Sequence, residues 1–398
     1  MKELFERQAK LLRNTQTAFV RSLLGDINWK ARLIGIKGAR GVGKTTLLLQ
    51  YIKLYLTPMT EKVLYISLDH IWFSDKNLYD VAADFVRMGG KHLFIDEVHY
   101  YENWAQEIKN IYDDFGELQI VFTGSSLLKI MDGRIDLSRR AVIYPMQGLS
   151  FREYINLETG KDFAKFSLEQ ILENHTKIAQ SVLTEIKPFQ YFRSYLEQGY
   201  FPFYREEQDL YPFRLNNIIN FILETELPLL RNIEISYVRK IKQLLMIIAE
   251  TVPFSPQISA ISRKMGINRI TLLRYLHYLA ESGLLNQLYK DGYGVSKLQK
   301  PNKIYLENTN YMYVLSDKPV NTGNIRETFF VNQLAYRHQV LLDKQADFKV
   351  NDKWVFEVGG KNKTGKQISG LKHAFLILDD IESGFQNKIP LWLFGFLY

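Results

Sequence analysis

Four short apolar runs near the start of the chain alternate with stretches that repeat apolar positions at helical spacing. The runs cover residues 32–36, 62–68, 92–95 and 119–123, and each is rich in Val, Ile, Leu or Phe. Strands of this kind are buried on both faces, as in a parallel sheet covered by helices. The pattern along residues 1–147 therefore predicts an α/β domain with a parallel sheet.

The pattern changes beyond this region. Helical spacing dominates residues 148–233, which we interpret as a helical lid or connector. Residues 234–313 predict three short helices and then two strands, and residues 314–398 combine a helix with a hairpin-like stretch around Asn351 and Asp352. A chain of 398 residues has room for about two or three domains, and its pattern divides into these four parts.

A glycine-rich segment follows the first apolar run. Its sequence, Gly38-Ala39-Arg40-Gly41-Val42-Gly43-Lys44-Thr45, fits the pattern G-x-x-x-x-G-K-[ST] in full, and a helical run begins at Thr46. Such a loop lets backbone N–H groups converge on a phosphate at a helix N-terminus. We expect Lys44 to reach the β- and γ-phosphates of a nucleotide and the Thr45 hydroxyl to bind Mg²⁺.

Two carboxylates end the third apolar run. Asp96 lies fifty-two residues beyond Lys44, and Glu97 follows it directly. Downstream of a phosphate loop, the first acid is placed to hold the water shell of Mg²⁺ and the second to orient and polarise the attacking water. Capping of a helix N-terminus is the alternative for such a pair, and the loop upstream makes it the weaker one.

Small hydroxyl residues and two arginines complete the candidate site. The run at 119–123 continues into Gly124, Ser125 and Ser126, so Ser125 or Thr123 could sense the γ-phosphate, with a serine-rich turn as an equal alternative. Arg139 or Arg140 could stabilise the charge of the transition state, within the chain or from a neighbouring copy. A solvated pair of arginines is equally compatible with the sequence.

These motifs together resemble the prokaryotic AAA-type ATPases that carry a C-terminal domain of unknown function. The resemblance covers nearly the whole chain and rests on residues 38–45, 94–99 with Trp104, 123–126, 137–140, 149–154 and 195–202. It implies ATP binding and hydrolysis by an AAA-type P-loop sheet, followed by a helical lid, a winged helix and a small α+β nuclease-like tail. It implies no settled cellular role.

Two positions depart from the pattern of that family. A second glycine is expected where Gln198 or Tyr200 stands, and the usual Gly-Arg pair is here Arg139-Arg140. The second departure leaves open which arginine faces the nucleotide.

A helix-turn-helix is predicted independently of the resemblance. Residues 258–264, the turn at 265–267 and residues 268–282 have its pattern, with Leu272, Leu276 and Leu279 as the buried stripe. Residues 284–288 and 303–306 would be wing strands. The positions left for an exposed or partly exposed face are Asn268, Arg269, Thr271, Arg274, Tyr275 and Tyr278, with Lys290, Lys297 and Lys300 on the loop between the strands.

Positive charge concentrates in the same region. The chain has 51 basic and 43 acidic residues, and residues 239–310 alone contain eleven basic and four acidic ones. A local basic patch is typical of a polyanion partner, so Arg269, Arg274, Lys297 and Lys300 are candidate contacts to double-stranded DNA. A fold of this kind can instead pack on a protein partner or a second copy of the chain, and charge alone does not separate these alternatives.

The last part of the chain carries a second set of chemically capable residues. Glu327, Asp347, Glu357 and Lys361 are the types that a Mg²⁺-dependent phosphodiesterase needs. The arrangement resembles a restriction-endonuclease-type core, but Gly359 stands where its lysine is expected, and Lys361 keeps the same strand parity two residues further on. A DNA-cleaving site, a degenerate core and unrelated surface acids all remain open.

Composition narrows the classes of function. The chain has no cysteine, which excludes disulfides, thiolate catalysis and iron–sulfur clusters. Charged residues interrupt the first fourteen positions, and no apolar run approaches the ~20 residues of a membrane-spanning helix, so we expect a cytoplasmic protein with no membrane partner. Two functions compete: an ATPase that couples nucleotide state to nucleic-acid or partner binding, and a slow nucleotide-gated switch.

Overall fold

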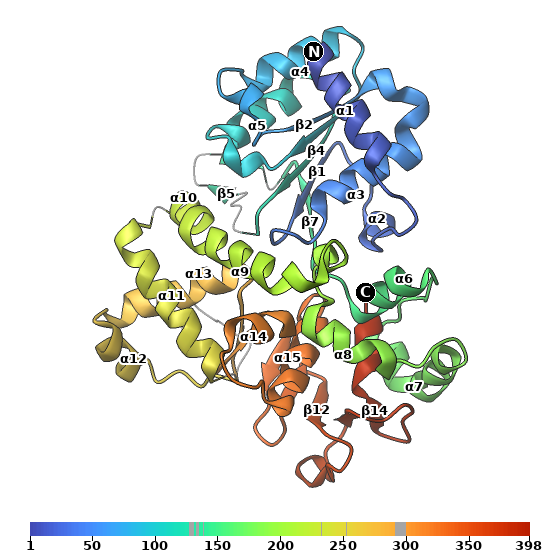
Figure 1. Ribbon diagram of the computed structural model, residues 1–398, viewed down its shortest axis with the longest axis vertical. Coiled ribbons are helices and arrows are strands. Elements are labelled where there is room, and N and C mark those ends of the chain that lie inside the picture. The colour runs from blue at the N-terminus through green and yellow to red at the C-terminus, as the bar shows by residue number, and fades with distance from the viewer. Residues whose placement is uncertain (127–130, 133–134, 138, 232, 252, 291–299) are drawn as a thin grey trace. The chain divides into compact units, whose positions relative to one another are not determined.

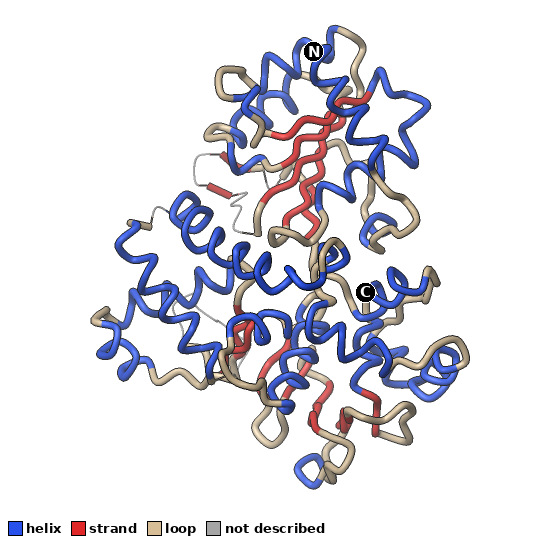
Figure 2. Tube along the Cα trace, in the orientation of Figure 1, coloured by secondary structure: helices blue, strands red, loops and turns tan. Residues whose placement is uncertain are grey.

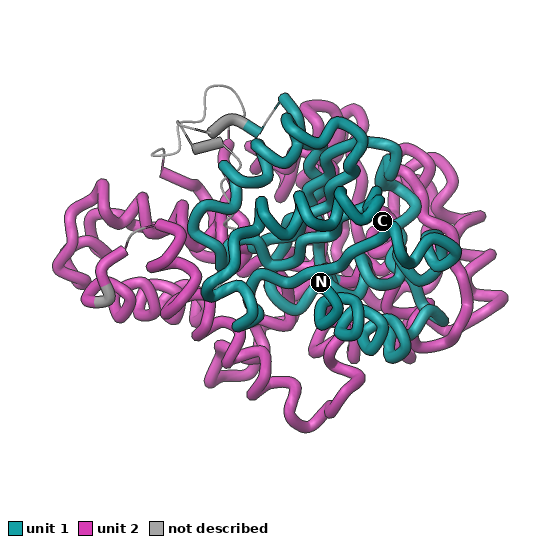
Figure 3. The backbone as a smooth tube through the Cα atoms, turned by 90° about the horizontal axis from the view of Figure 1, so that it is seen from above, with its two compact units in different colours: residues 1–148 teal, residues 149–398 magenta. Residues whose placement is uncertain are grey.

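The computed structural model describes residues 1–398 apart from 127–130, 133–134, 138, 232, 252 and 291–299 (Figure 1). The chain forms two compact units, unit 1 (Met1–Gly148) and unit 2 (Leu149–Tyr398), which Figure 3 colours separately. Within the described residues, every helix is too short or too polar to cross a membrane.

Unit 1 is built on a five-stranded parallel sheet in the order β2-β3-β4-β1-β7, drawn in red in Figure 2. Its strands are β1 (Leu33–Lys37), β2 (Val63–Ser67), β3 (His92–Asp96), β4 (Gln119–Gly124) and β7 (Val142–Pro145). The first four are the predicted apolar runs, so the α/β prediction is confirmed. Sequence reasoning missed β7, because this edge strand is only partly buried and carries no sustained apolar run.

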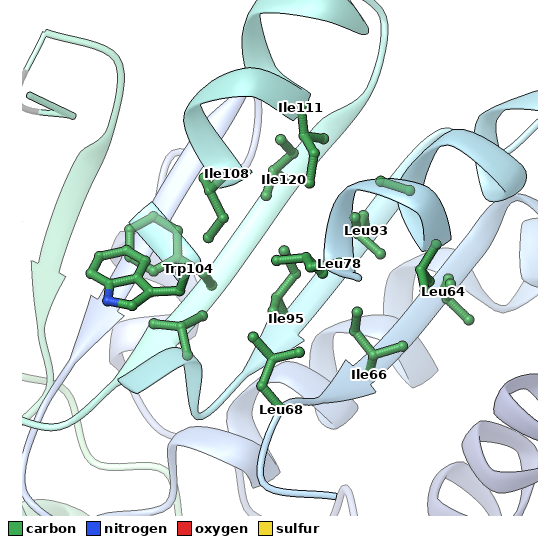
Figure 4. Packing of buried hydrophobic residues seen from close by; sticks show 14 of the residues in the cluster. Leu64, Ile66, Leu68, Leu78, Leu93, Ile95, Trp104, Ile108, Ile111 and Ile120 are labelled. Atoms are coloured by element: carbon green, nitrogen blue, oxygen red, sulfur yellow. The ribbon is translucent and has the colours of Figure 1, made fainter. Parts of the chain in front are cut away.

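Helices surround this sheet. The α-helices are α1 (Lys2–Asn14), α2 (Leu23–Asp26), α3 (Lys44–Tyr51), α4 (Leu78–Arg87) and α5 (Trp104–Asp114). Shorter helical segments are the π-helical η1 (Ile52–Leu56) and the 3₁₀ turns η2 (Thr57–Lys62), η3 (Ile71–Phe73) and η4 (Val98–Tyr100). Two short strands, β5 (Met131–Asp132) and β6 (Ile135–Asp136), pair antiparallel outside the main sheet. Apolar side chains of α4 and α5, such as Leu78 and Ile108, pack on β2, β3 and β4 (Figure 4). This core fixes the sheet whose carboxyl ends carry the candidate site.

Unit 2 contains ten α-helices among its described residues. They are α6 (Phe151–Thr159), α7 (Leu168–Leu183), α8 (Phe189–Gln198), α9 (Tyr211–Phe221), α10 (Leu227–Arg231), α11 (Ile235–Glu250), α12 (Ile258–Met265), α13 (Arg269–Glu281), α14 (Thr309–Leu315) and α15 (Thr322–Ala335). Shorter helical segments are η5 (Pro202–Arg205), η6 (Gln208–Leu210), η7 (Ile222–Glu226), η8 (Lys366–Ile368) and η9 (Leu391–Phe396). Ser150 and Glu153 form a capping box at the start of α6, which explains why that helix begins there.

Two sheets complete the described part of unit 2. The strands β8 (Leu285–Leu288) and β9 (Lys303–Leu306) pair antiparallel. A five-stranded mixed sheet has the order of β10 (Val340–Leu342), β11 (Phe348–Val350), β12 (Trp354–Gly359), β13 (Ala374–Leu378) and β14 (Lys388–Pro390). The hairpin predicted around Asn351 and Asp352 is present, since these residues form the turn between β11 and β12 with positive φ angles of 51° and 54°.

The predicted helix-turn-helix elements are all found. Helix α12 ends at Met265 and is capped by Gly266. Helix α13 begins after Asn268, whose side chain accepts a hydrogen bond of 2.8 Å from the Thr271 N–H. The predicted leucine stripe of α13 is buried. Tyr275 was expected on the exposed face, and this prediction is wrong. The residue is 4% exposed, and its ring centroid lies 6.3 Å from that of Tyr237 on α11.

Candidate functional site

The phosphate loop connects β1 to α3 at the carboxyl end of the sheet. Gly41 and Gly43 adopt φ angles of 86° and 98°, a left-handed region that residues with a Cβ rarely enter. Gly43 directly precedes the first residue of α3, Lys44. The glycines of the motif therefore allow the chain to turn sharply into the N-terminus of a helix, where N–H groups are open to an anion.

Lys44 folds back over this loop. Its Nζ donates hydrogen bonds to the carbonyl oxygens of Gly38 at 2.9 Å and Ala39 at 3.1 Å, and the residue is 5% exposed. The ammonium group thus lies inside the curve of the loop, as a phosphate-binding lysine requires. Thr46, in the first turn of α3, is exposed.

The two predicted motifs meet at Thr45 and Asp96. The Thr45 hydroxyl donates a hydrogen bond of 2.6 Å to Oδ2 of Asp96, which is 1% exposed at the end of β3. The hydroxyl of Tyr65 donates to the same oxygen at 2.8 Å, and that of Thr123 donates to Oδ1. Burial and the neighbouring Asp96 raise the pKa of Tyr65 well above its ordinary value, so it remains a donor. Tyr65 was missed because it lies inside an apolar strand with no motif of its own.

Glu97 is held in an unusual backbone conformation. Its φ and ψ of 54° and 45° are left-handed, and strain of this kind in a residue other than glycine is often associated with function. The Glu97 N–H donates to Oγ1 of Thr123 at 3.1 Å, and its Oε2 lies 3.3 Å from Nδ1 of His99. The Glu97 side chain is 19% exposed. Unlike Asp96, it is accessible to solvent.

The structure separates the two arginines. Nε and Nη2 of Arg140 donate to the two carboxylate oxygens of Asp113 on α5 at 3.0 and 3.1 Å. The same hydrogen bonds hold the pKa of Asp113 below its ordinary value. Arg139, in contrast, is exposed. Arg140 thus has a structural partner, and Arg139 is the better candidate for contact with a nucleotide.

A buried arginine near the N-terminus contacts the site from outside every predicted motif. Arg21 is 7% exposed and donates to the backbone carbonyl oxygen of Val42 in the phosphate loop at 2.7 Å. Sequence reasoning missed it because it stands alone between predicted elements. Its role arises from the tertiary structure and leaves no local signal.

The three predicted acids of unit 2 pair with lysines other than Lys361: Asp347 and Glu357 lie near Lys363, and Glu327 lies 3.7 Å from Lys303. Glu357 on β12 is 0% exposed, and its Oε1 lies 2.5 Å from Nζ of Lys363, which is also 3.6 Å from Oδ2 of Asp347. Burial raises the pKa of Glu357, and its hydrogen bond with Lys363 opposes this rise. Glu327 accepts a hydrogen bond of 2.7 Å from the Tyr305 hydroxyl.

Lys361 is exposed and does not occupy the predicted position. The prediction assumed an extended strand, but β12 ends at Gly359 and the chain turns, with the Lys363 N–H donating to the Gly360 carbonyl at 2.9 Å. A Cβ on Gly359 would collide with the Lys363 side chain, so the glycine leaves room for that lysine to reach Glu357. Within the described part of the chain, no three Asp, Glu, His or Cys side chains are grouped so that they could hold a metal ion.

The candidate DNA-binding face lies on α13. Arg269, Ile270 and Arg274 are exposed. Glu281, the last residue of the helix, is engaged by Arg231 through two hydrogen bonds of 3.1 Å. Lys300 is exposed, whereas Lys297 lies outside the described residues. The exposed charges at the start of α13 are therefore positive.

Comparison with known families bears on the first unit. Residues 30–155 match the family described as an AAA domain. This stretch, which contains the phosphate loop and the carboxylate pair, is therefore similar to an AAA domain. Residues 189–317 match a domain of unknown function, which assigns no activity to unit 2.

Similar proteins extend this comparison without adding an activity. An uncharacterized protein of Methanocaldococcus jannaschii is 29% identical over 292 residues, which are 70% of this chain and 61% of that protein. The chain thus spans less than two thirds of the relative's length.

Among solved structures, AMPPCP-bound DnaA from Aquifex aeolicus is 17% identical, with a TM-score of 0.25 over 70% of this chain and 88% of that one. PCH-2 from C. elegans is also 17% identical, with a TM-score of 0.25 over 42% and 50% of the two chains. Similarities this low carry no argument about function.

Proposed function

We propose that this protein is an ATPase, which binds ATP with Mg²⁺ in the phosphate loop and hydrolyses it with Glu97 as the general base. The observation that carries the proposal is the 2.6 Å hydrogen bond between Thr45 and Asp96. It joins the phosphate loop to the carboxylate motif at the same edge of the sheet, with Glu97 directly beyond. The AAA-type character of residues 30–155 supports nucleotide as the ligand.

The side chains present fit a magnesium nucleotide. The Thr45 hydroxyl and the Asp96 carboxylate supply oxygen atoms, which are the ligands that Mg²⁺ prefers. When bound, Mg²⁺ neutralises charge that develops on the phosphates. Lys44 would exchange its carbonyl partners in the loop for phosphate oxygens, and the N–H groups at the start of α3 would bind the β-phosphate.

Glu97 would orient a water molecule and accept its proton. Three hydroxyl groups donate hydrogen bonds to the buried carboxylate of Asp96, whereas the Glu97 carboxylate is partly exposed and can reach water. Arg139 would stabilise negative charge at the γ-phosphate, since Arg140 is engaged by Asp113. Ser125, at the end of β4, would contact the γ-phosphate.

Nucleic acid is the partner that the surface of unit 2 favours. We propose that α12, α13, β8 and β9 form a winged helix that binds double-stranded DNA, and that nucleotide state controls this binding. The exposed Arg269 and Arg274 support the proposal, as does the excess of basic residues in this region.

Steady-state ATP hydrolysis by the full chain, with and without double-stranded DNA, tests both proposals. Glu97→Gln should bind ATP and lose turnover, while Glu102→Gln, an exposed control with the same change in charge, should match the wild type. Lys44→Ala should lose tight ATP binding. DNA should raise wild-type turnover several-fold. Tight ATP binding with background turnover would instead favour the slow nucleotide-gated switch, and turnover indifferent to DNA would favour a protein partner or a second copy.

A further inference from the structure

We infer that His99 is a positioning residue that orients the carboxylate of Glu97 in response to nucleotide. The inference rests on the proposed hydrolysis of ATP. His99 lies in η4, two residues beyond Glu97, and its side chain is 1% exposed. A single ring nitrogen, Nδ1, lies 3.3 Å from Oε2 of Glu97 and 3.4 Å from the backbone nitrogen of Ser125.

Nδ1 must donate to form a hydrogen bond with one of these neighbours and must accept to form one with the other. The Glu97 carboxylate accepts hydrogen bonds, and the Ser125 N–H donates them. In the neutral ring the single proton lies on Nδ1 when that atom donates to Glu97, and on Nε2 when Nδ1 accepts from Ser125. The two hydrogen bonds are therefore alternatives, and His99 has two discrete bonding states.

Ser125 connects this choice to the nucleotide. It stands immediately after β4, at the carboxyl edge of the sheet where the phosphate loop also lies. When the Ser125 N–H turns towards the γ-phosphate of ATP, Nδ1 is left to donate to Glu97. The base is then oriented when ATP is present, and it loses that hydrogen bond when Ser125 binds the ring instead.

A second contact links the ring to the phosphate loop. The His99 ring centroid lies 4.4 Å from that of Tyr100, whose hydroxyl accepts a hydrogen bond of 3.0 Å from Nη1 of Arg40. Arg40 belongs to the phosphate loop, so a rearrangement of the loop is transmitted to the packing on His99. The left-handed backbone of Glu97 is strained, and strain of this kind persists only where surrounding contacts hold the residue in place.

Three substitutions separate hydrogen bonding from packing. His99→Phe keeps a ring against Tyr100 without a nitrogen, His99→Asn places an amide near the position of Nδ1, and His99→Ala removes both. We expect single-turnover hydrolysis to fall at least tenfold in the Ala and Phe variants, and to stay within about threefold of wild type in the Asn variant. ATP affinity should not fall by more than about twofold in any of the three, because His99 does not itself contact the nucleotide and its loss leaves the Ser125 N–H available to the γ-phosphate.

Wild-type hydrolysis by the Phe variant would overturn the inference, since packing alone would then suffice. So would an Asn variant as slow as the Phe variant. These outcomes are distinct from failure of the proposed function: if the wild type turns over ATP and Glu97→Gln does not, the ATPase stands whatever the His99 variants show. A wild type without turnover overturns both.

Discussion

The guanidinium group of Arg21 lies between the phosphate loop and the last residues of unit 1. Besides its bond to the Val42 carbonyl at 2.7 Å, Nη2 donates to the carbonyl oxygens of Gln147 and Gly148, each at 2.8 Å. One buried cation thus fixes the loop to the end of the unit through backbone atoms. The arrangement makes the position of the loop depend on a residue outside every motif.

Arg21→Ala should therefore impair both stability and nucleotide binding. Removing the guanidinium leaves three carbonyl groups short of a donor, and we expect the free energy of unfolding to fall by about 2–4 kcal/mol. ATP affinity should fall as well, because Val42 loses its anchor. Urea denaturation and ATP titration measure the two effects, with Arg13→Ala on the exposed surface of α1 as control. Equal stability of the two variants would contradict this role.

Sequence patterns identified the residues whose chemistry is local. The phosphate loop and the carboxylate pair were found because spacing along the chain determines their geometry, and four strands were found because they are apolar throughout. Arg21 could not be found in this way, since it contacts carbonyl groups 126 and 127 residues away. β7 escaped for a related reason, because an edge strand need not be uniformly apolar.

Thr123→Val should reduce turnover while sparing ATP binding. The buried hydroxyl donates to Asp96 and accepts from the Glu97 N–H, so its loss removes the link between the two carboxylate residues. We expect kcat to fall roughly 10- to 100-fold, since a misplaced general base contributes less. Thr57→Val, at an exposed position, is the control. A kcat unchanged from wild type would show that Glu97 does not depend on Thr123.

Lys363 and Lys361 should differ sharply when each is replaced by alanine. Lys363→Ala leaves the buried Glu357 without its cation, and we expect the free energy of unfolding to fall by about 2 kcal/mol. This is less than for a fully buried pair, because Lys363 is partly exposed. Lys361→Ala should change the unfolding free energy by less than about 0.5 kcal/mol, as is usual for exposed positions. Urea denaturation of both variants makes the comparison, and equal losses would refute it.

Lys361 and Lys363 also show why the alternation of side chains along a strand did not predict the correct lysine. Parity predicts side-chain direction only while the chain stays extended. Because β12 ends at Gly359 and the chain then turns, Lys363 reaches Glu357 in place of the expected Lys361. DNA cleavage by unit 2 is one of three alternatives that the sequence left open, beside a degenerate core and unrelated surface acids; nicking that requires Mg²⁺ and disappears in Glu357→Ala would establish it.

Arg269→Ala and Arg274→Ala should each weaken binding to double-stranded DNA across all sequences. If each arginine neutralises a phosphate, the slope of log affinity against log salt should fall by about one per substitution. Lys177→Ala, which removes an exposed charge from α7, should change neither quantity. Fluorescence anisotropy at several salt concentrations gives affinity and slope together. Unchanged slopes in both arginine variants would contradict contacts between this face and DNA.

We expect Glu307 to make the unfolding free energy of unit 2 depend on pH. Its Oε1 accepts hydrogen bonds of 2.8 Å from both Tyr200 and Asn332, and its Oε2 accepts one of 2.7 Å from Asn308. Burial nevertheless raises the pKa of Glu307 from 4.5 to about 7. The folded protein therefore binds this proton more tightly than the unfolded chain, and unfolding free energy should fall as pH rises from about 4.5 to about 7.

Glu307→Gln should remove that dependence, because the amide is neutral throughout and keeps one oxygen to accept from Tyr200 and Asn332. The wild type should lose about 3 kcal/mol relative to Glu307→Gln between pH 4.5 and pH 8, the free energy of a shift of this size. Urea denaturation across this range measures the difference, with the exposed Glu173→Gln as control. Because its side chain is exposed on α7, Glu173→Gln should follow the wild type. A difference between wild type and Glu307→Gln that stays constant with pH would contradict the prediction, because it would show that folding does not shift the pKa of Glu307.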